Sequence, residues 1–358
     1  MMMFSAEKPF SGIGQHGLGA VEPLCPVFGQ CGGCAYQDIP YPEELRVKEE
    51  YLKGLLRERW DLPSERFEAI VPSPESYHYR SRLDIKLVRK KAGEIAIGFS
   101  NEHTKRHIPI ERCFIAKRGI SDFIIGLKEQ ATAKLTAKHR QANLVVKTGD
   151  DTRILWGGIG RRSLQLKEEE YLWTEVLGKR IFYSLDTFFQ ANLSILPKII
   201  ERVRAFAFLN EETVLYDLYG GVGLFGLCLA DKVREVILIE ENKASVALAR
   251  FNERYHRLDN LRIVEGKVEE KLPALLEEGR FPVAFLDPPR GGLSPAAQDH
   301  LSGEKRFSHI LYLSCQPATL VRDLDRFVNK NWKIEKIMPF DFFPKTRHVE
   351  TLVLLKQT

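Results

Sequence analysis

The sequence lacks several features that mark whole classes of protein. No stretch approaches about 18 uninterrupted apolar residues, which excludes an ordinary transmembrane helix. Segment 1–8 has no basic stretch followed by an apolar run, so we expect a cytoplasmic protein with no membrane association. Neither charge sign dominates: 53 basic and 48 acidic residues give a net +5, which permits a polyanionic partner without requiring one. At 358 residues, 44% hydrophobic and 28% charged, the composition is that of a folded protein of two or three domains.

Cysteine is scarce, and the placement of its six residues is informative. Without an export signal they argue against a disulfide framework and for metal binding or catalysis. Cys25, Cys31 and Cys34 follow a C-x5-C-x2-C spacing in a glycine-containing loop, so three thiolates converge on one point. Both a zinc site and a cubane iron–sulfur cluster need a fourth ligand, and Cys113 is the only other cysteine in the first half. Three clustered cysteines plus a distant one favour a [4Fe–4S] cluster, with zinc as the alternative.

The last two cysteines lie in the second half of the chain. Cys228 falls in an apolar helical stretch, and we interpret it as a core residue. Cys315 follows the apolar run 310–313, at the expected carboxyl end of a buried strand. Such ends are where α/β enzymes place their chemistry, although a packing cysteine is the alternative interpretation.

Hydrophobic periodicity divides the chain into three parts. Segment 43–59 predicts an amphipathic helix beside the cysteine loop. Segment 77–183 predicts a β-rich domain, with expected strands at 83–87, 95–99, 144–146 and 180–183. Basic residues such as Arg82, Lys86 and Arg89 give this part a character suited to RNA phosphates, with solvated strand faces as the alternative. Strands alternate with helices after Asp186, which predicts a doubly wound parallel sheet.

A glycine-rich loop follows the first strand of this third part. The segment 221–226 matches G-x-G-x-x-G, and Glu240 ends the next strand where a ribose ligand belongs, which alone suggests a nicotinamide dehydrogenase. Asp217, however, would repel a pyrophosphate and suits the cationic amino group of S-adenosylmethionine. These residues therefore favour a methyltransferase over a dehydrogenase.

A second loop has the sequence Asp-Pro-Pro-Arg at 287–290. Its two prolines fix a stiff backbone that aims Asp287 into the cleft at the carboxyl edge of the sheet. Methyltransferases that act on exocyclic amines of bases have a related loop with an aromatic fourth residue. Arg290 in that position argues against their chemistry.

Together these motifs resemble the S-adenosylmethionine-dependent RNA uracil-5-methyltransferases, in particular the iron–sulfur type that acts on 23S rRNA. The stretches that carry the resemblance are Cys25–Cys34 with Cys113, Asp186–Asn192, Asp217–Phe225, Asp287–Arg290, Leu313–Leu320 and Asp341–Glu350. They span nearly the whole chain in the family's order.

The resemblance implies the α/β fold of a class I methyltransferase, with a doubly wound sheet. We expect an iron–sulfur segment and helix at 1–70, a β-rich RNA-binding domain at 71–185 and the methyltransferase domain at 186–358. A [4Fe–4S] cluster on the four cysteines is also implied, and we expect a monomer.

The resemblance also implies roles for single residues. Cys315 is the nucleophile that adds to carbon 6 of uracil, and Glu350 is the general base that removes the proton from carbon 5. The positions expected to bind S-adenosylmethionine are Gln190, Asp217, Tyr219, Gly221, Gly223, Leu224, Glu240, Lys267 and Asp287.

The expected activity is methylation of carbon 5 of a uridine in 23S rRNA, and the T-loop uridine of tRNA is the alternative substrate. An iron–sulfur nicotinamide oxidoreductase and a non-catalytic RNA-binding protein are alternatives from other classes. Members with this cysteine spacing often begin with an additional β-barrel that binds RNA. Only 24 residues precede Cys25, so we expect that module to be absent and leave the target uridine open.

Overall fold

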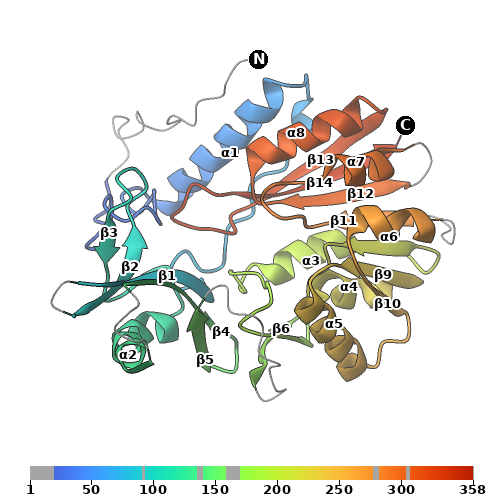
Figure 1. Ribbon diagram of the computed structural model, residues 1–358. Coiled ribbons are helices and arrows are strands. Elements are labelled where there is room, and N and C mark those ends of the chain that lie inside the picture. The colour runs from blue at the N-terminus through green and yellow to red at the C-terminus, as the bar shows by residue number, and fades with distance from the viewer. Residues whose placement is uncertain are drawn as a thin grey trace.

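The computed structural model describes residues 20–90, 93–134, 140–158, 170–276, 282–303 and 307–357. Segment 1–8, in which we expect no signal sequence, lies outside the described residues. Figure 1 shows a smaller antiparallel sheet on one side of the molecule and a larger sheet, layered with helices, on the other. None of the helices in the described ranges is both long and apolar enough to cross a membrane.

Helix α1 (Tyr41–Arg57) joins the cysteine loop to the larger sheet. It begins directly after Pro40, and its acidic first-turn residues Glu43 and Glu44 suit the positive end of a helix dipole. Its buried side chains include Leu52 and Leu56, which pack into the core beneath α8 (Pro317–Val328). The helix predicted at 43–59 is confirmed, with both ends two residues earlier.

The smaller sheet has five antiparallel strands in the order β3-β2-β1-β4-β5. Its members are β1 (Arg82–Arg89), β2 (Ile95–Ser100), β3 (His107–Pro109), β4 (Gln141–Thr148) and β5 (Ile154–Gly158). Leu83, Ile85 and Leu87 of β1 alternate inward, and α2 (Arg118–Lys134) packs on that side.

The strand expected at 180–183 exists as β7 (Lys179–Tyr183), although it is not part of this sheet. It pairs with β6 (Leu172–Val176) in a separate two-stranded ribbon that packs against α5 (Lys243–His256). The reason is that its buried side chains, Ile181 and Tyr183, join the core of the larger sheet.

The larger sheet has seven strands in the order β10-β9-β8-β11-β12-β14-β13. Its members are β8 (Val214–Leu218), β9 (Glu235–Glu240), β10 (Leu261–Glu265), β11 (Pro282–Leu286), β12 (His309–Ser314), β13 (Trp332–Phe340) and β14 (Glu350–Gln357). The first five in chain order are parallel, which confirms the doubly wound prediction. β14 instead runs antiparallel to both of its neighbours, because a short hairpin connection and not a helical crossover precedes it.

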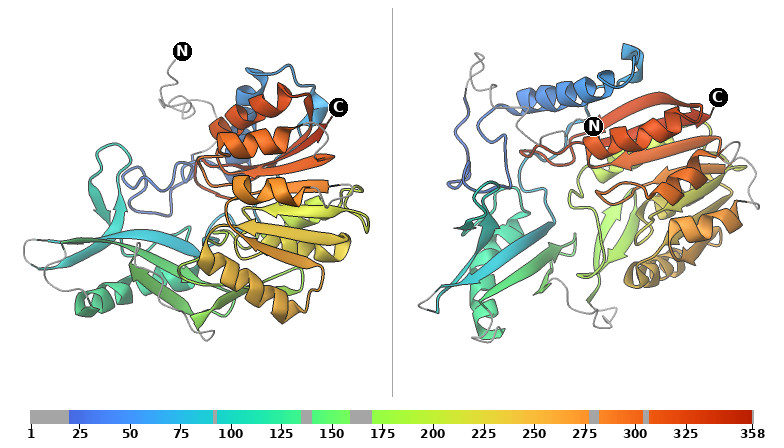
Figure 2. Two further views of the ribbon diagram at one scale, coloured as in Figure 1. Left: turned by 45° about the vertical axis from the view of Figure 1, so that its right-hand side comes forward. Right: turned by 45° about the horizontal axis from the view of Figure 1, so that its top comes forward.

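Helices cover both faces of this sheet (Figure 2). One face packs against α3 (Leu196–Arg204), α4 (Leu224–Leu229), α5 and the β6-β7 ribbon. The other face packs against α1, α6 (Val268–Leu275), α7 (Pro295–Ser302) and α8. Strand order reverses between β8 and β11, so a crevice is expected at the carboxyl ends of these strands.

Candidate active site

The glycine-rich loop turns sharply between β8 and α4. Gly223, the residue that precedes α4, has a φ of +94°, a left-handed conformation that glycine adopts without steric cost. Gly226 lies one turn later, and a Cβ there would come within 2.9 Å of Asp217 Oδ2. The missing side chain lets the Gly226 N–H donate to that oxygen at 2.8 Å.

Asp217 is an almost completely buried carboxylate at the end of β8, only 1% exposed. Its Oδ2 accepts the bond from Gly226, whereas its Oδ1 is buried and has no hydrogen-bond partner among the described residues. Burial, and then the nearby Glu240, raise the pKa of Asp217 to about 7. A buried acceptor without a partner is costly, so this oxygen fits a cationic or N–H donor supplied by a ligand.

Glu240 ends β9 and holds the glycine loop from the side. Its Oε2 accepts a hydrogen bond from the Gly221 N–H at 3.0 Å, and its Oε1 accepts one from the Asn242 N–H at 2.7 Å. The Glu240 carbonyl accepts a third from Gly266 at 2.9 Å, which brings the start of α6 to the same edge of the sheet.

Asp287 follows β11 at this edge, as its position before two prolines predicts. Its Oδ2 accepts a hydrogen bond from Gln190 Nε2 at 2.7 Å, which joins two predicted cofactor residues. Burial and the charge of Asp217 raise the pKa of Asp287 to about 7, although the bond from Gln190 opposes the shift.

Cys315 and Glu350 come from neighbouring strands of the sheet. Ser314 of β12 pairs with Thr351 of β14, so Cys315 directly follows one member of this pair and Glu350 directly precedes the other. The antiparallel direction of β14 therefore brings the two predicted catalytic residues to the same edge.

Cys315 and Glu350 share an electrostatic environment with Asp287 and Arg290. Burial raises the pKa of the Cys315 thiol to about 11, and the neighbouring Glu350 contributes to this rise. Glu350 is 4% exposed, and burial followed by the charge of Asp287 raises its pKa well above the usual carboxyl range. The Arg290 guanidinium lowers the pKa of both groups, so it stabilises the thiolate and the carboxylate.

Two residues of this site had no role in the sequence-based assignment. The sequence identifies Arg290 only as the fourth residue of the Asp-Pro-Pro-Arg loop, and its electrostatic effect on Cys315 depends on the fold. The pKa of His348 is lowered to about 4, first by burial and then by Arg290, which keeps the imidazole neutral. His348 lies in the carboxyl-terminal motif 341–350, and membership of this motif is the one feature of the sequence that could have pointed to His348.

Three further predicted residues line the same region with different exposure. Leu224 is the buried first residue of α4, and Tyr219 has a φ of 63° in the turn after β8. The Lys267 backbone precedes α6 at this edge, but its exposed side chain lies 3.9 Å from Glu270. The described contacts therefore direct its ammonium to that surface carboxylate and not to Asp217 or Glu240.

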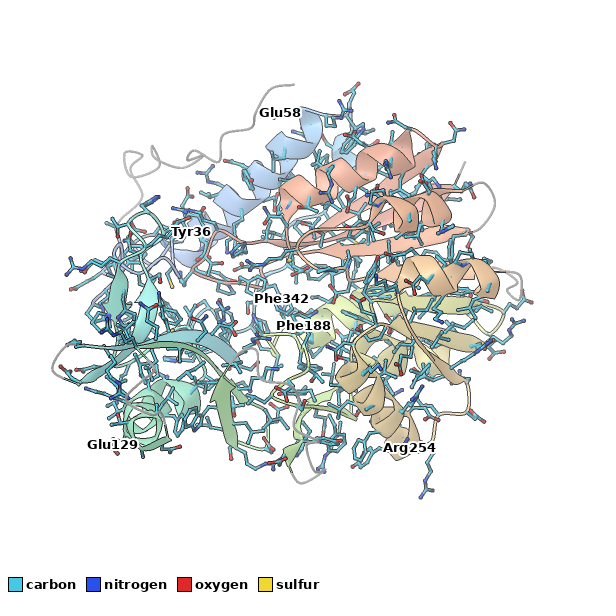
Figure 3. The ribbon with its side chains drawn as sticks, in the orientation of Figure 1. Tyr36, Glu58, Glu129, Phe188, Arg254 and Phe342 are labelled. Atoms are coloured by element: carbon cyan, nitrogen blue, oxygen red, sulfur yellow. The ribbon has the colours of Figure 1, made fainter. Side chains whose placement is uncertain are left out.

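Phe188 is an exposed aromatic residue two positions before Gln190. It belongs to the motif 186–192 that supplies Gln190, and its ring is 60% exposed. Figure 3 shows Phe188 and Phe342 between the smaller and the larger sheet.

Cys25, Cys31, Cys34 and Cys113 all line one cavity of about 270 Å³. Its wall also includes the rings of Phe28 and of Phe99, which belongs to β2. Burial raises the pKa of the Cys34 thiol to about 12 and that of Cys113 to about 11. Within the described part of the chain, no three His, Cys, Asp or Glu side chains are grouped so as to hold a metal ion.

Cys228 is separate from this group. It is buried in α4, as the sequence predicts for a core cysteine.

Comparison with known proteins adds independent information. The family model for tRNA (uracil-5-)-methyltransferase matches residues 159–358. An uncharacterised RNA methyltransferase of Clostridium acetobutylicum is 28% identical over 94% of this chain and 84% of its own length. The 23S rRNA (uracil(1939)-C(5))-methyltransferase of a Marinomonas species is also 28% identical, over 94% of this chain and 81% of its own length.

A solved structure has the same fold. The Pyrococcus abyssi tRNA (uracil-54, C5)-methyltransferase, determined with S-adenosyl-L-homocysteine, superposes with a TM-score of 0.69. The match covers 90% of this chain and 85% of that chain at 23% identity. The family match spans more than half of the sequence, and the chain therefore belongs to the tRNA (uracil-5-)-methyltransferase family, whose members are S-adenosylmethionine-dependent RNA uracil-5-methyltransferases.

Proposed function

We propose that this protein methylates carbon 5 of a uridine in 23S rRNA through a covalent adduct between Cys315 and carbon 6. The observation that carries the proposal is the Ser314–Thr351 pairing, which sets the Cys315 thiol and the Glu350 carboxyl at one edge of the sheet. Carbon 5 of uracil is a weak nucleophile, and addition of a thiolate to carbon 6 converts the ring to an enolate that can attack a methyl group.

The Cys315 thiolate forms a bond to carbon 6, and the electron pair of the carbon 5–carbon 6 double bond moves into the enolate. Carbon 5 then takes the methyl group of S-adenosylmethionine, whose sulfonium leaves as a neutral thioether. Glu350 removes the remaining proton on carbon 5, the double bond re-forms, and the cysteine leaves as thiolate.

Arg290 stabilises the negative charges that these reaction steps require on Cys315 and Glu350. The thiol of Cys315 and the carboxyl of Glu350 are both held protonated by burial, and the guanidinium favours the charged form of each. A uridine within folded RNA must leave its base stack for Cys315 to approach the ring, and the exposed ring of Phe188, two residues before Gln190, offers an apolar face on which a base can stack.

We assign the methyl donor to the crevice between β8, β9 and β11. The orphaned Oδ1 of Asp217 suits its amino group, and the carboxylate of Glu240 suits the ribose hydroxyls. The remaining proposed contacts are Gln190, Tyr219, Gly221, Gly223, Leu224, Lys267 and Asp287, with Lys267 contributing through its backbone position.

We also propose that Cys25, Cys31, Cys34 and Cys113 hold a [4Fe–4S] cluster. Four thiols around one largely apolar cavity support this assignment, because cubane clusters take four thiolate ligands. The four thiols line one cavity of the described structure without being grouped closely enough to hold a metal ion, so cluster binding would have to draw them together. The bound cluster would supply redox-active iron held by thiolates. Anaerobically purified protein should contain about four irons and four sulfides per chain, and Cys34→Ser should lose both. Stoichiometric zinc without iron would contradict the cluster.

To test the activity, the protein is incubated with labelled S-adenosylmethionine and with either 23S rRNA or bulk tRNA from cells that lack the gene. We expect 5-methyluridine in 23S rRNA with the wild-type protein and none with Cys315→Ala. The 28% identical Marinomonas relative supports rRNA as the substrate. Label in tRNA alone would show that tRNA and not 23S rRNA is the substrate. If neither RNA is labelled although the protein binds the methyl donor, the proposal is rejected.

A further inference from the structure

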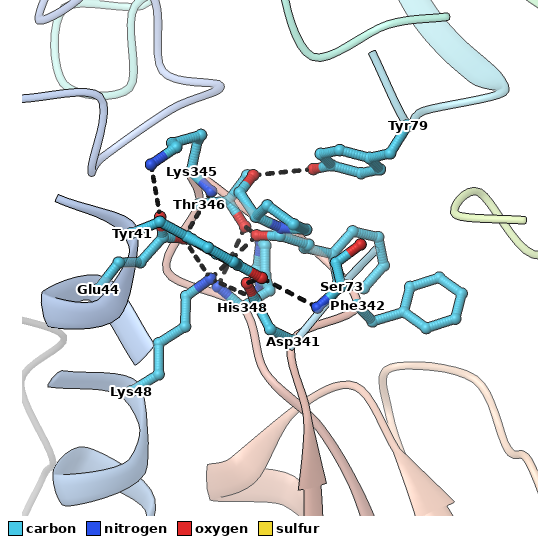
Figure 4. Close-up of polar contacts among 12 residues, drawn as sticks. Tyr41, Glu44, Lys48, Ser73, Tyr79, Asp341, Phe342, Lys345, Thr346 and His348 are labelled. Carbon is cyan, nitrogen blue, oxygen red and sulfur yellow. Dashed lines mark hydrogen bonds and ion pairs between the residues drawn. The ribbon is translucent and has the colours of Figure 1, made fainter. Parts of the chain in front are cut away.

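The loop between β13 and β14 delivers both His348 and Glu350 to the site. Its two ends are fixed, because Phe340 at the end of β13 pairs with Glu350 at the start of β14. Between these ends the loop packs beneath α1, where a group of buried charged side chains meets it (Figure 4). The conformation of this loop therefore depends on a helix that precedes it by about 300 residues.

Lys345, at the centre of the loop, has an uncommon backbone conformation. Its φ is 65°, in the left-handed region that lysine rarely adopts, and the residue is only 3% exposed. Such strain persists only where the surroundings over-determine it, and it concentrates at functional sites.

Glu44 of α1 supplies one side of this support. Its Oε1 accepts a hydrogen bond from the Lys345 N–H at 2.5 Å, and its Oε2 lies 3.1 Å from the Lys345 ammonium. One carboxylate thus binds the backbone and the side chain of the same strained residue. The opposite side comes from the cysteine loop: the N–H groups of Ala35 and Tyr36 both donate to the Lys345 carbonyl, at 2.7 and 3.2 Å.

The charges around Lys345 balance. Lys48 lies 2.8 Å from Glu44 Oε1 and 2.6 Å from Asp341 Oδ1, so two carboxylates and two ammonium groups alternate in a buried quartet. Lys48 also donates to the Phe343 carbonyl at 3.1 Å, which adds a second contact to the loop. Removal of one carboxylate from such a quartet leaves an uncompensated buried cation.

We propose that Glu44 is a positioning residue for Glu350. It holds Lys345 in its left-handed conformation and thereby fixes the loop that leads into β14, the strand that Glu350 begins. The inference rests on the proposed function, because it takes Glu350 as the general base. It has one consequence for the cysteine loop. Ala35 directly follows Cys34, so the geometry of the cysteine site and that of the catalytic strand are linked through the carbonyl of Lys345.

The first test compares Glu44→Gln with Glu50→Gln, which changes an exposed carboxylate of the same helix. For Glu44→Gln we expect kcat to fall at least about tenfold with KM for S-adenosylmethionine unchanged, because the cofactor crevice is untouched. We also expect faster amide hydrogen exchange in 341–350 and at 35–36. A covalent RNA adduct should accumulate, because a displaced Glu350 removes the proton from carbon 5 more slowly. Glu50→Gln should match the wild-type protein in all three measurements.

A purely structural role of Glu44 predicts something different: less folded protein, with kcat per folded molecule unchanged. That result would overturn the proposal. Lys345→Met serves if Glu44→Gln does not fold, since methionine keeps the length of the side chain but loses the ammonium that Glu44 binds, and like lysine it rarely adopts the left-handed conformation. It should reproduce the drop in kcat, and wild-type kcat would again count against the inference.

The link to the cysteine site has its own readout. Cys34→Ser should raise hydrogen exchange in 341–350, and unchanged exchange there would disprove the link. Hydrogen exchange is measured without RNA or methyl donor, so its outcome does not depend on the activity. A wild-type protein that makes no 5-methyluridine would reject the proposed function but not the structural link.

Discussion

Gln190 donates a hydrogen bond from Nε2 to Oδ2 of Asp287 at 2.7 Å, although 97 residues separate the two in sequence. The bond joins the motif after β7 to the loop after β11, so two segments with separate signatures meet at the carboxyl edge of the larger sheet. Asp217 acts on the same carboxylate through its charge, which makes the electrostatics of the crevice depend on pH near neutrality.

Affinity for S-adenosylhomocysteine should rise with pH. The pKa of Asp217 is raised to about 7, so its carboxylate is largely protonated at pH 6 and charged at pH 8, and only the charged form attracts the ligand's ammonium group. Binding linked to one such proton strengthens about tenfold between these pH values. Calorimetric titration at pH 6, 7 and 8 measures it. Asp217→Asn should bind weakly with a flatter pH dependence, and an equally steep dependence in this variant would assign the proton elsewhere.

Alkylation of Cys315 by iodoacetamide should be slow at neutral pH. Because the pKa of the thiol is raised to about 11, the thiolate fraction and the rate grow about tenfold per pH unit across pH 7–10. Arg290→Gln should slow the reaction further by removing the cation that favours the thiolate, and Arg290→Lys should restore most of the rate. Peptide mass spectrometry follows the modification, with exposed Arg254→Gln as control. Faster alkylation in Arg290→Gln would contradict this electrostatic role.

Glu350→Gln should separate adduct formation from release. The amide cannot remove the proton from carbon 5, so the methylated RNA remains bound to Cys315. We expect a protein–RNA band that survives denaturing electrophoresis and a turnover rate at least about 100-fold below wild type. Glu335→Gln, on the adjacent strand β13, should turn over normally. Turnover at the wild-type rate in Glu350→Gln would require another base.

Lys147 should make folding stability depend on pH. This buried residue of β4 donates to the carbonyls of Ser184 and Thr187, and burial, followed by the charge of Arg82, lowers its pKa to about 7. Between pH 7 and 10 the unfolded chain binds the proton and the folded chain does not, so this group makes stability rise with pH, by at most about 1.4 kcal/mol per unit.

Lys147→Met should flatten that rise, as measured by urea unfolding at several pH values across this window. Lys128→Met, which changes an exposed lysine of α2, should keep the wild-type slope. Parallel curves for wild type and Lys147→Met would show that the proton binds elsewhere.

The sequence by itself determined the motifs and the order of elements. Alternating and continuous apolar runs encode strands directly, so β1, β8 and β9 were predictable within a few residues. The position of Asp217 and Asp287 was predictable too, because glycines or prolines after a strand already mark its carboxyl end at the edge of a sheet.

Only the tertiary structure decided which distant residues act together. The antiparallel direction of β14 brings Glu350 to Cys315, and the fold alone sets Arg290 close enough to shift the pKa of both. The sequence likewise gave no sign that β7 packs with the larger sheet or that Glu44 supports Lys345. Local sequence patterns determine how each segment pairs its own backbone hydrogen-bonding groups. Burial and the Coulomb interaction depend instead on distances in space, and the tertiary fold sets these distances between residues that are hundreds of positions apart in sequence.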